Sequence, residues 1–125
     1  MSGIIQITLP WPPTVNHYWQ RNADGSIRIS KEGKSFREAV CWAVMEKSLG
    51  AGLASLVNVS IEAYAPDNRR RDIDNVLKAL LDALTHAGVW SDDDQVDDLR
   101  IRWMRDAAGK KIIGGMVKVT IEGMV

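Results

Sequence analysis

A strand pattern followed closely by a helix pattern constrains the fold of this chain most. Residues 57–65 alternate between apolar and polar side chains, which predicts a strand with one buried face. A helix is predicted from Asp72 or Asp74 to about residue 86, where apolar side chains recur at helical spacing: Val76, Leu77, Leu80, Leu81 and Leu84. Because a half-buried strand and an amphipathic helix must cover each other, the chain is predicted to pack helices against a sheet.

Shorter patterns predict the remaining elements. Strands are expected at four further places: residues 4–9, 26–30, 96–104 and 112–122. Gly114 and Gly115 interrupt the last of these, and Ser30 is predicted to cap a second helix that runs to about residue 49. The order ββαβαββ predicts an α+β fold, a two-layer sandwich in which a mixed sheet of about four to five strands carries two helices on one face.

Four of the eight aromatic side chains lie in two segments with different patterns. Within residues 96–104, three side chains alternate with polar residues and are predicted to face the core: Leu99, Ile101 and Trp103. The other segment is rich in proline near residue 10 and polar over residues 14–26, which predicts a loop. It holds Trp11, Tyr18 and Trp19, which we do not expect to belong to the core.

The composition fits a small globular protein. The length of 125 residues suits one domain, residues 1–125, and no apolar run approaches the roughly 18 residues that a membrane span requires. No basic residues precede the short apolar stretch at the N-terminus, so no signal peptide is expected. Cys41 is the only cysteine, which excludes a disulfide framework within the chain. We therefore expect a cytoplasmic protein.

Arginines and acids meet in residues 69–74, immediately before the predicted helix. The net charge of the chain is zero, with 16 basic and 16 acidic side chains, so bulk charge alone does not favour nucleic-acid binding. Asp72 and Asp74 could serve only to cap the helix. Two acids beside three arginines also suit a site where a magnesium ion, held by the carboxylates, lets a phosphate approach.

Lys78 extends this cluster along the predicted helix. It lies four residues after Asp74 and four before Asp82, so the three side chains form one stripe. Two salt bridges, worth a few tenths of a kcal/mol each, would explain this spacing without any function. The alternative is that Lys78 points to a metal site and stabilises the charge that develops on a phosphate.

A second acidic cluster follows the predicted helix: Asp92, Asp93 and Asp94. Such a run is often no more than a solvated turn. If the strand at residues 96–104 pairs near the strand at residues 57–65, however, the two acidic clusters meet at one end of the sheet and offer three carboxylates to a metal ion. The spacing of the acids excludes an EF-hand, and His17 and His86 lack the ligand-spaced partners of a zinc site.

Three segments of the chain together are specific for one protein family, although none of them is specific alone. They are LPWPPTVNHYW near the N-terminus, RRRDIDNVLKALLDAL at the predicted helix and AGVWSDDDQV after it. In their order and spacing, over most of the chain, they resemble the RusA family of Holliday-junction resolvases from phages, prophages and bacteria. The resemblance implies a homodimeric endonuclease that depends on magnesium, for which manganese can substitute. It implies cleavage of four-way DNA junctions by paired, symmetric nicks, with a preference for certain dinucleotides.

The resemblance also assigns roles to individual residues. The family's catalytic positions match Asp72, Asp74, Asp93 and Lys78, with the three acids as the metal ligands. The family's DNA-binding loop matches Arg69, Arg70 and Arg71. Asp94 departs from the pattern, because we do not expect an acid there. The choice of the third ligand among Asp92, Asp93 and Asp94 therefore stays open, with Asp93 preferred.

The chemistry that follows is hydrolysis of a phosphodiester bond. One or two magnesium ions held by the acids would activate a water molecule and stabilise the leaving 3′ oxygen. The arginines would neutralise backbone phosphates, and a two-fold dimer would supply two sites related by the symmetry of the junction. Trp11, Tyr18 and Trp19 could stack at an opened junction centre, or they could pack under their own loop or in a dimer interface.

Two other functions are compatible with the same residues. One is a module that binds branched DNA without cutting it, although the complete set of acids and lysine argues against this function. The other is a flap or branch nuclease of broader specificity, which a comparison of flap, linear and four-way substrates would identify.

Overall fold

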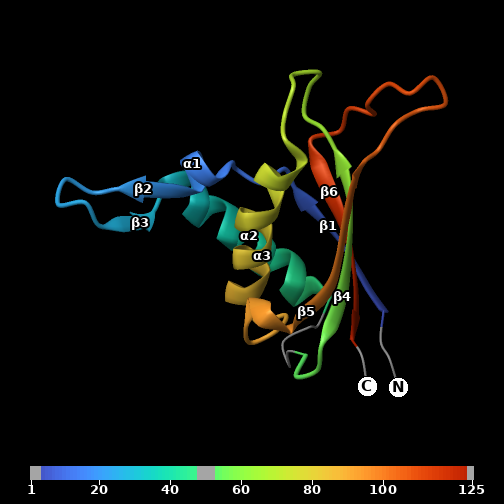
Figure 1. Ribbon diagram of the computed structural model, residues 1–125. Helices are drawn as coiled ribbons and strands as arrows, with labels where there is room; N and C mark the ends of the chain where they lie inside the picture. Colours follow the sequence, from blue (N-terminus) through green and yellow to red (C-terminus); the bar gives the residue numbers. More distant parts are fainter. Residues whose placement is uncertain (1–3, 48–52, 124–125) are drawn as a thin grey trace.

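A four-stranded mixed sheet with two helices on one face forms the body of the molecule (Figure 1). The structure is a computed structural model that describes residues 4–47 and 53–123. The strand order is β1-β6-β4-β5, where the strands are β1 (Ile4–Pro10), β4 (Val57–Tyr64), β5 (Val96–Trp103) and β6 (Met116–Gly123). Strand β6 pairs antiparallel with both β1 and β4, whereas β5 pairs parallel with β4. The predicted α+β sandwich is confirmed.

The helical layer consists of α2 (Lys31–Glu46) and α3 (Leu77–His86), which run side by side over the sheet (Figure 1). Ser30 caps α2 as predicted, since its side chain accepts a hydrogen bond of 2.9 Å from the Gly33 amide. The expected end of this helix near residue 49 lies outside the described residues. Gly88, with a φ of 82°, follows the C-terminal end of α3, where glycine adopts this backbone conformation without strain.

A small hairpin projects from the helical layer, away from the sheet (Figure 1). It consists of β2 (Trp19–Arg21) and β3 (Ile27–Ile29), and a one-turn helix, α1 (Val15–Tyr18), precedes it. The strand predicted at residues 26–30 therefore exists, but it pairs with β2 rather than with the main sheet. The prediction of a loop over residues 14–26 is wrong for α1 and β2, whose short lengths leave little periodicity to detect.

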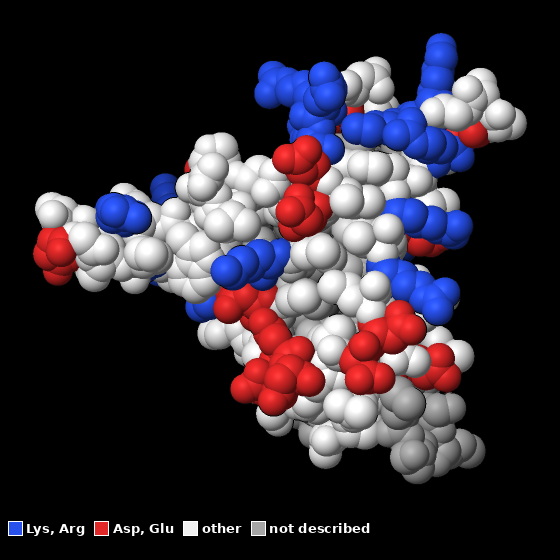
Figure 2. All heavy atoms as spheres, viewed as in Figure 1, with Lys and Arg blue, Asp and Glu red and all other residues white. Residues whose placement is uncertain are grey.

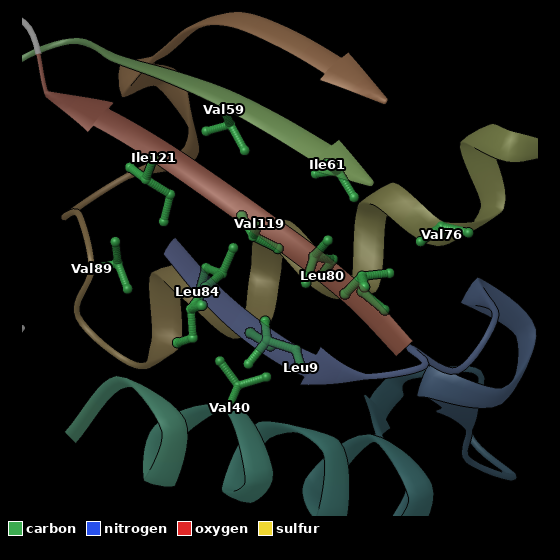
Figure 3. Close-up of a cluster of buried hydrophobic side chains, with 14 of the residues drawn as sticks. Leu9, Val40, Val59, Ile61, Val76, Leu80, Leu84, Val89, Val119 and Ile121 are labelled. Carbon is green, nitrogen blue, oxygen red and sulfur yellow. The ribbon is translucent and has the colours of Figure 1, made fainter. Parts of the chain in front are cut away.

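The core lies between the sheet and the two helices (Figure 3). The apolar face of β4 is buried there as its alternation predicts. Helix α3 and the turn before it contribute five buried side chains, Val76, Ala79, Leu80, Ala83 and Leu84. Helix α2 contributes three, Phe36, Val40 and Val44. Among the described helices, none is long and apolar enough to cross a membrane.

Two predictions about the last strands are wrong in part. Ile101 and Trp103 do pack against the core, half-buried, but Leu99 is 38% exposed, because β5 lies at the edge of the sheet beside β4. The last strand begins at Met116 rather than near residue 112. The amides of Gly114 and Gly115 both bond the carbonyl of residue 65, so the chain cannot extend the strand ladder there.

Tyr18 belongs to the core, contrary to the sequence prediction. Its side chain is fully buried, while Trp11 and Trp19 are half-buried against the same cluster. The approach of this segment to α2 requires Gly33, because a Cβ at that position would lie 2.5 Å from the Tyr18 carbonyl oxygen. Tyr18 therefore packs under its own segment, which is one of the roles considered for the three rings.

Candidate functional site

Asp72 and Asp74 lie at the N-terminal end of α3, where the chain leaves β4 and enters the 3₁₀ turn η1 (Ile73–Val76). Both side chains are exposed. Asp72 occupies the N-cap position of η1, yet its side chain makes no capping hydrogen bond. Helix capping therefore does not account for this carboxylate, which stays available for a ligand.

The arginines before these acids divide into two groups. Arg71 donates bonds of 2.6 and 3.0 Å to Asp67, and the Arg69 amide donates another of 2.9 Å. These bonds stabilise the ionised carboxylate and hold the pKa of Asp67 at about 2. The Arg71 side chain has the largest effect, followed by the Arg69 amide. Arg71 thus fixes the loop, whereas the side chains of Arg69 and Arg70 are exposed, with Arg69 Nε in a long ion pair of 3.9 Å to Asp67.

A strongly basic groove begins at these residues. Its volume is about 640 Å³, and its lining comes from the β4–η1 and β5–β6 loops: Asn68, Arg70, Arg71, Asp72, Trp103, Arg105, Lys110 and Lys111. Figure 2 shows the basic side chains gathered over these two loops, directly above an acidic group at η1. No sequence pattern indicated that the β5–β6 loop forms the second wall of this groove.

Trp103 and Lys111 form part of one wall of the groove, and Trp11 packs against Trp103. The rings of Trp11 and Trp103 are stacked, with centroids 5.7 Å apart and an angle of 18° between planes. The Lys111 ammonium lies 4.2 Å from the centroid of Trp103, where a cation–π interaction stabilises it. Trp11 is therefore engaged within the protein, and Lys111 is held at the wall rather than extended freely.

Lys78 lies one turn into α3 and is exposed. It lines a second cavity, of about 720 Å³, between α3 and the β2–β3 hairpin. In the part of the chain that the structure describes, Lys78 forms no salt bridge with Asp74 or Asp82. The structural alternative for this stripe, two salt bridges along the helix, is therefore not realised.

The second acidic cluster is held at the C-terminal end of α3. Asp92 accepts a bond of 3.1 Å from the Asp94 amide and so caps the 3₁₀ turn η2 (Asp93–Gln95). The Asp93 carboxylate accepts a hydrogen bond from the hydroxyl of Thr85, in the last turn of α3. That hydroxyl accepts one of 2.7 Å from the indole of the buried Trp90. The side chain of Asp93 is thus anchored to the helix end.

The two acidic clusters therefore lie at opposite ends of α3, and the prediction that they meet at one end of the sheet is wrong. Figure 2 shows one acidic group at η1 and another over the lower end of α3 and η2. A helix of ten residues, the length of α3, spans about 15 Å. The two clusters are apart because β4 and β5 pair in parallel. Asp72 follows the end of β4, whereas Asp93 precedes the start of β5.

The acids of one chain fit a magnesium ion only in part. Carboxylate oxygens are the donors that magnesium prefers, and one or two of them suffice when waters and a substrate phosphate complete the shell. Asp72 and Asp74 meet this requirement by type, position and exposure. Across residues 4–47 and 53–123, however, no group of three His, Cys, Asp or Glu side chains could hold a metal ion. Asp72, Asp74 and Asp93 of one chain therefore do not come together as a single metal-binding group in the described residues.

Comparison with known proteins shows the family of this chain. Residues 10–122 match the family model described as "Endodeoxyribonuclease RusA". The chain is 44% identical over 118 residues to "Crossover junction endodeoxyribonuclease RusA" of Escherichia coli (strain K12), covering 94% of this chain and 93% of the relative. It is 45% identical, with the same coverage, to the proteins of that name from Shigella sonnei (strain Ss046) and Enterobacteria phage 82. The chain therefore belongs to the RusA family of endodeoxyribonucleases.

Proposed function

We propose that this chain is an endodeoxyribonuclease that resolves four-way DNA junctions by paired, symmetric nicks. The observation that carries the proposal is the position of Asp72, whose exposed carboxylate lies in the lining of a groove that also contains five cationic side chains. Its relatives are named for crossover-junction cleavage. A groove of this charge attracts a polyanion, and carboxylates at its edge suit hydrolysis of the bound backbone.

The residues of the site have separate tasks in this reaction. Arg70, Arg105 and Lys110 neutralise backbone phosphates and so position the duplex. Asp72 and Asp74 would hold a magnesium ion, which would supply a polarised water and a Lewis acid at the scissile phosphate. Lys78, on the turn of α3 that follows these acids, stabilises the negative charge that grows on the phosphate in the transition state.

We further propose that the active form is a two-fold homodimer. Asp93 is held at the far end of α3 from Asp72 and Asp74, so these acids cannot meet within one chain. A two-fold axis that places two copies of α3 antiparallel would bring Asp93 of the partner subunit to Asp72 and Asp74. The same axis would create two equivalent sites, which paired and symmetric nicking requires.

Incubation of a synthetic four-way junction with the protein and magnesium tests this function, with the nicks mapped on each strand. The parent protein is expected to give paired nicks at symmetric positions. Asp74→Asn should abolish cleavage while binding of the junction persists, because the substitution removes a metal ligand and leaves the basic groove intact. Glu38→Gln, which removes an exposed carboxylate from α2, serves as the matched control and should cut like the parent.

Three results would contradict the proposal. Cleavage by Asp74→Asn at the parental rate would exclude that acid from the metal site. Binding by the parent protein without nicks, across a range of pH and with either magnesium or manganese, would indicate a branched-DNA binding module. Equal cleavage of flap, linear and four-way substrates would indicate a nuclease of broader specificity.

A further inference from the structure

Lys78 has a carboxylate neighbour that the fold keeps away from it. Asp82 lies four residues further along α3, a spacing at which a lysine and an acid commonly pair. Its Oδ2 atom instead accepts bonds of 2.8 and 3.2 Å from the Arg37 guanidinium on α2, and another from the Tyr18 hydroxyl on α1. We infer that Arg37 and Tyr18 are positioning residues, which hold Asp82 so that the Lys78 ammonium stays available for the scissile phosphate.

The geometry explains why Arg37 prevails over Lys78 as the partner of Asp82. Its guanidinium makes two hydrogen bonds to one carboxylate oxygen and a third, of 2.8 Å, to the Tyr18 hydroxyl. It also lies over the rings of Tyr18 and Trp19, at 5.7 and 5.8 Å from their centroids. A lysine cannot reproduce this planar, stacked and forked arrangement. The Arg37 and Asp82 side chains are 22% and 32% exposed, so the pair is partly shielded from water.

Tyr18 contributes a neutral donor to the same network. Burial and then the hydrogen bond to Asp82 raise the pKa of its hydroxyl well above the ordinary value, so the group keeps its proton at neutral pH. The hydroxyl can therefore always donate to Asp82. Together the two donors bond Oδ2 from the side of α1 and α2, and the charge of Arg37 offsets that of the carboxylate, which lowers its tendency to bind a further cation.

The direction in which Lys78 extends decides whether it can act on a phosphate. An ion pair with Asp82 would draw its ammonium toward the C-terminal end of α3 and neutralise it. With Asp82 already bonded, the acid within helical reach of Lys78 is Asp74, one turn before it and part of the proposed metal site. The network therefore leaves the lysine without an ion pair to Asp82, in the wall of the cavity between α3 and the β2–β3 hairpin and one turn from Asp74. This inference rests on the proposed function, because the role of Lys78 is defined by cleavage.

The test substitutes Arg37 by methionine, which keeps most of the aliphatic stem and removes the charge. Released from Arg37, Asp82 is expected to pair with Lys78, and the single-turnover cleavage rate should fall about tenfold while junction affinity changes little. The double variant Arg37→Met/Asp82→Asn removes the competing carboxylate and should recover a rate within about threefold of the parent. Arg102→Met is the matched control, since it breaks a 3.0 Å pair with Glu62 elsewhere on the sheet and should cut normally.

Two measurements separate this role from a purely structural one. The rates are taken at a temperature where circular dichroism shows every variant folded, so lost stability does not lower them. A crystal structure of Arg37→Met should then show an ion pair between Lys78 and Asp82. Parental cleavage by Arg37→Met, or a double variant as slow as the single one, would overturn the inference. If the parent itself does not cleave, the proposed function fails, and the absence of the Lys78–Asp82 pair from that crystal structure would still refute the inference.

Discussion

At the scale of single residues, the fold decides which of several similar side chains is used for structure. Three consecutive arginines precede Asp72, and Arg70 and Arg71 both line the basic groove, yet Arg71 is also bonded to Asp67 whereas Arg70 is exposed to solvent. The same contrast occurs among the three acids that follow α3, where Asp92 caps η2 and Asp93 bonds Thr85. Residue type alone does not distinguish these roles, because they depend on which partner the backbone brings within reach.

The pair of Asp67 and Arg71 makes a prediction about pH. Because the pKa of Asp67 in the folded protein is about 2, below its ordinary value near 4, the stability it contributes is complete above about pH 4. That contribution should be lost as the pH falls through about 2. In a ¹³C NMR titration of the side-chain carboxyls, Asp67 should show no transition near pH 4.

Substitution of the partner tests the cause of this shift. Arg71→Met removes the hydrogen bonds that stabilise the carboxylate, so the midpoint of Asp67 should move up toward its ordinary range. Arg100→Met, which removes an exposed arginine from β5, should leave that midpoint in place. A titration of Asp67 near pH 4 in the parent protein would show that the pair is not formed in solution.

At the scale of elements, burial depends on the layer that covers a strand or helix and not only on its pattern. The stripe of α3 is buried as its spacing predicts, because the helix lies against the middle of the sheet. Strand β5 has the same kind of alternation, but its apolar face is only partly covered at the edge of the sheet. Periodicity therefore identifies the face that can be buried, while the tertiary fold determines how far it is buried.

A matched pair of leucine substitutions measures this difference. Leu80 on α3 is fully buried, so Leu80→Ala should lower the free energy of unfolding by about 2–5 kcal/mol through lost contacts and a cavity. Leu99 on β5 is 38% exposed, and Leu99→Ala should cost less than about 1 kcal/mol. Urea unfolding of the two variants at neutral pH provides the comparison. Equal losses of stability would mean that β5 is covered in solution, for example by a second copy of the chain.

At the scale of the whole molecule, the parallel pairing of β4 and β5 shapes both the groove and the division of the acids. Parallel strands end at the same edge, so the loops that follow β4 and β5 together form the basic groove. The same pairing places η2, which precedes β5, at the opposite edge with Asp93. One topological feature thus brings the cations together and keeps the third acid apart from the first two.

Mixed dimers test whether two subunits share each site. Asp74→Asn and Asp93→Asn should each be inactive alone. A co-expressed mixture should recover cleavage, because in the heterodimer one site collects both defects and the other has none. Random pairing gives heterodimers in half of the molecules, so roughly a quarter of the sites should be active. Junctions should then be nicked on one strand, and a mixture as inactive as its components would show that each site lies within one chain.

The sequence by itself determined the half-buried strand β4, the amphipathic helix α3, the capped helix α2 and the exposed acids at the start of η1. These features follow from local periodicity and from the chemistry of neighbouring side chains, which the order of residues specifies directly. Only the tertiary structure decided the second wall of the groove, the burial of Tyr18, the pairing of Arg37 with Asp82 and the separation of Asp93 from Asp72. Each of these depends on contacts between segments far apart in the chain. Such contacts are set by strand direction and helix packing, which no local sequence pattern specifies.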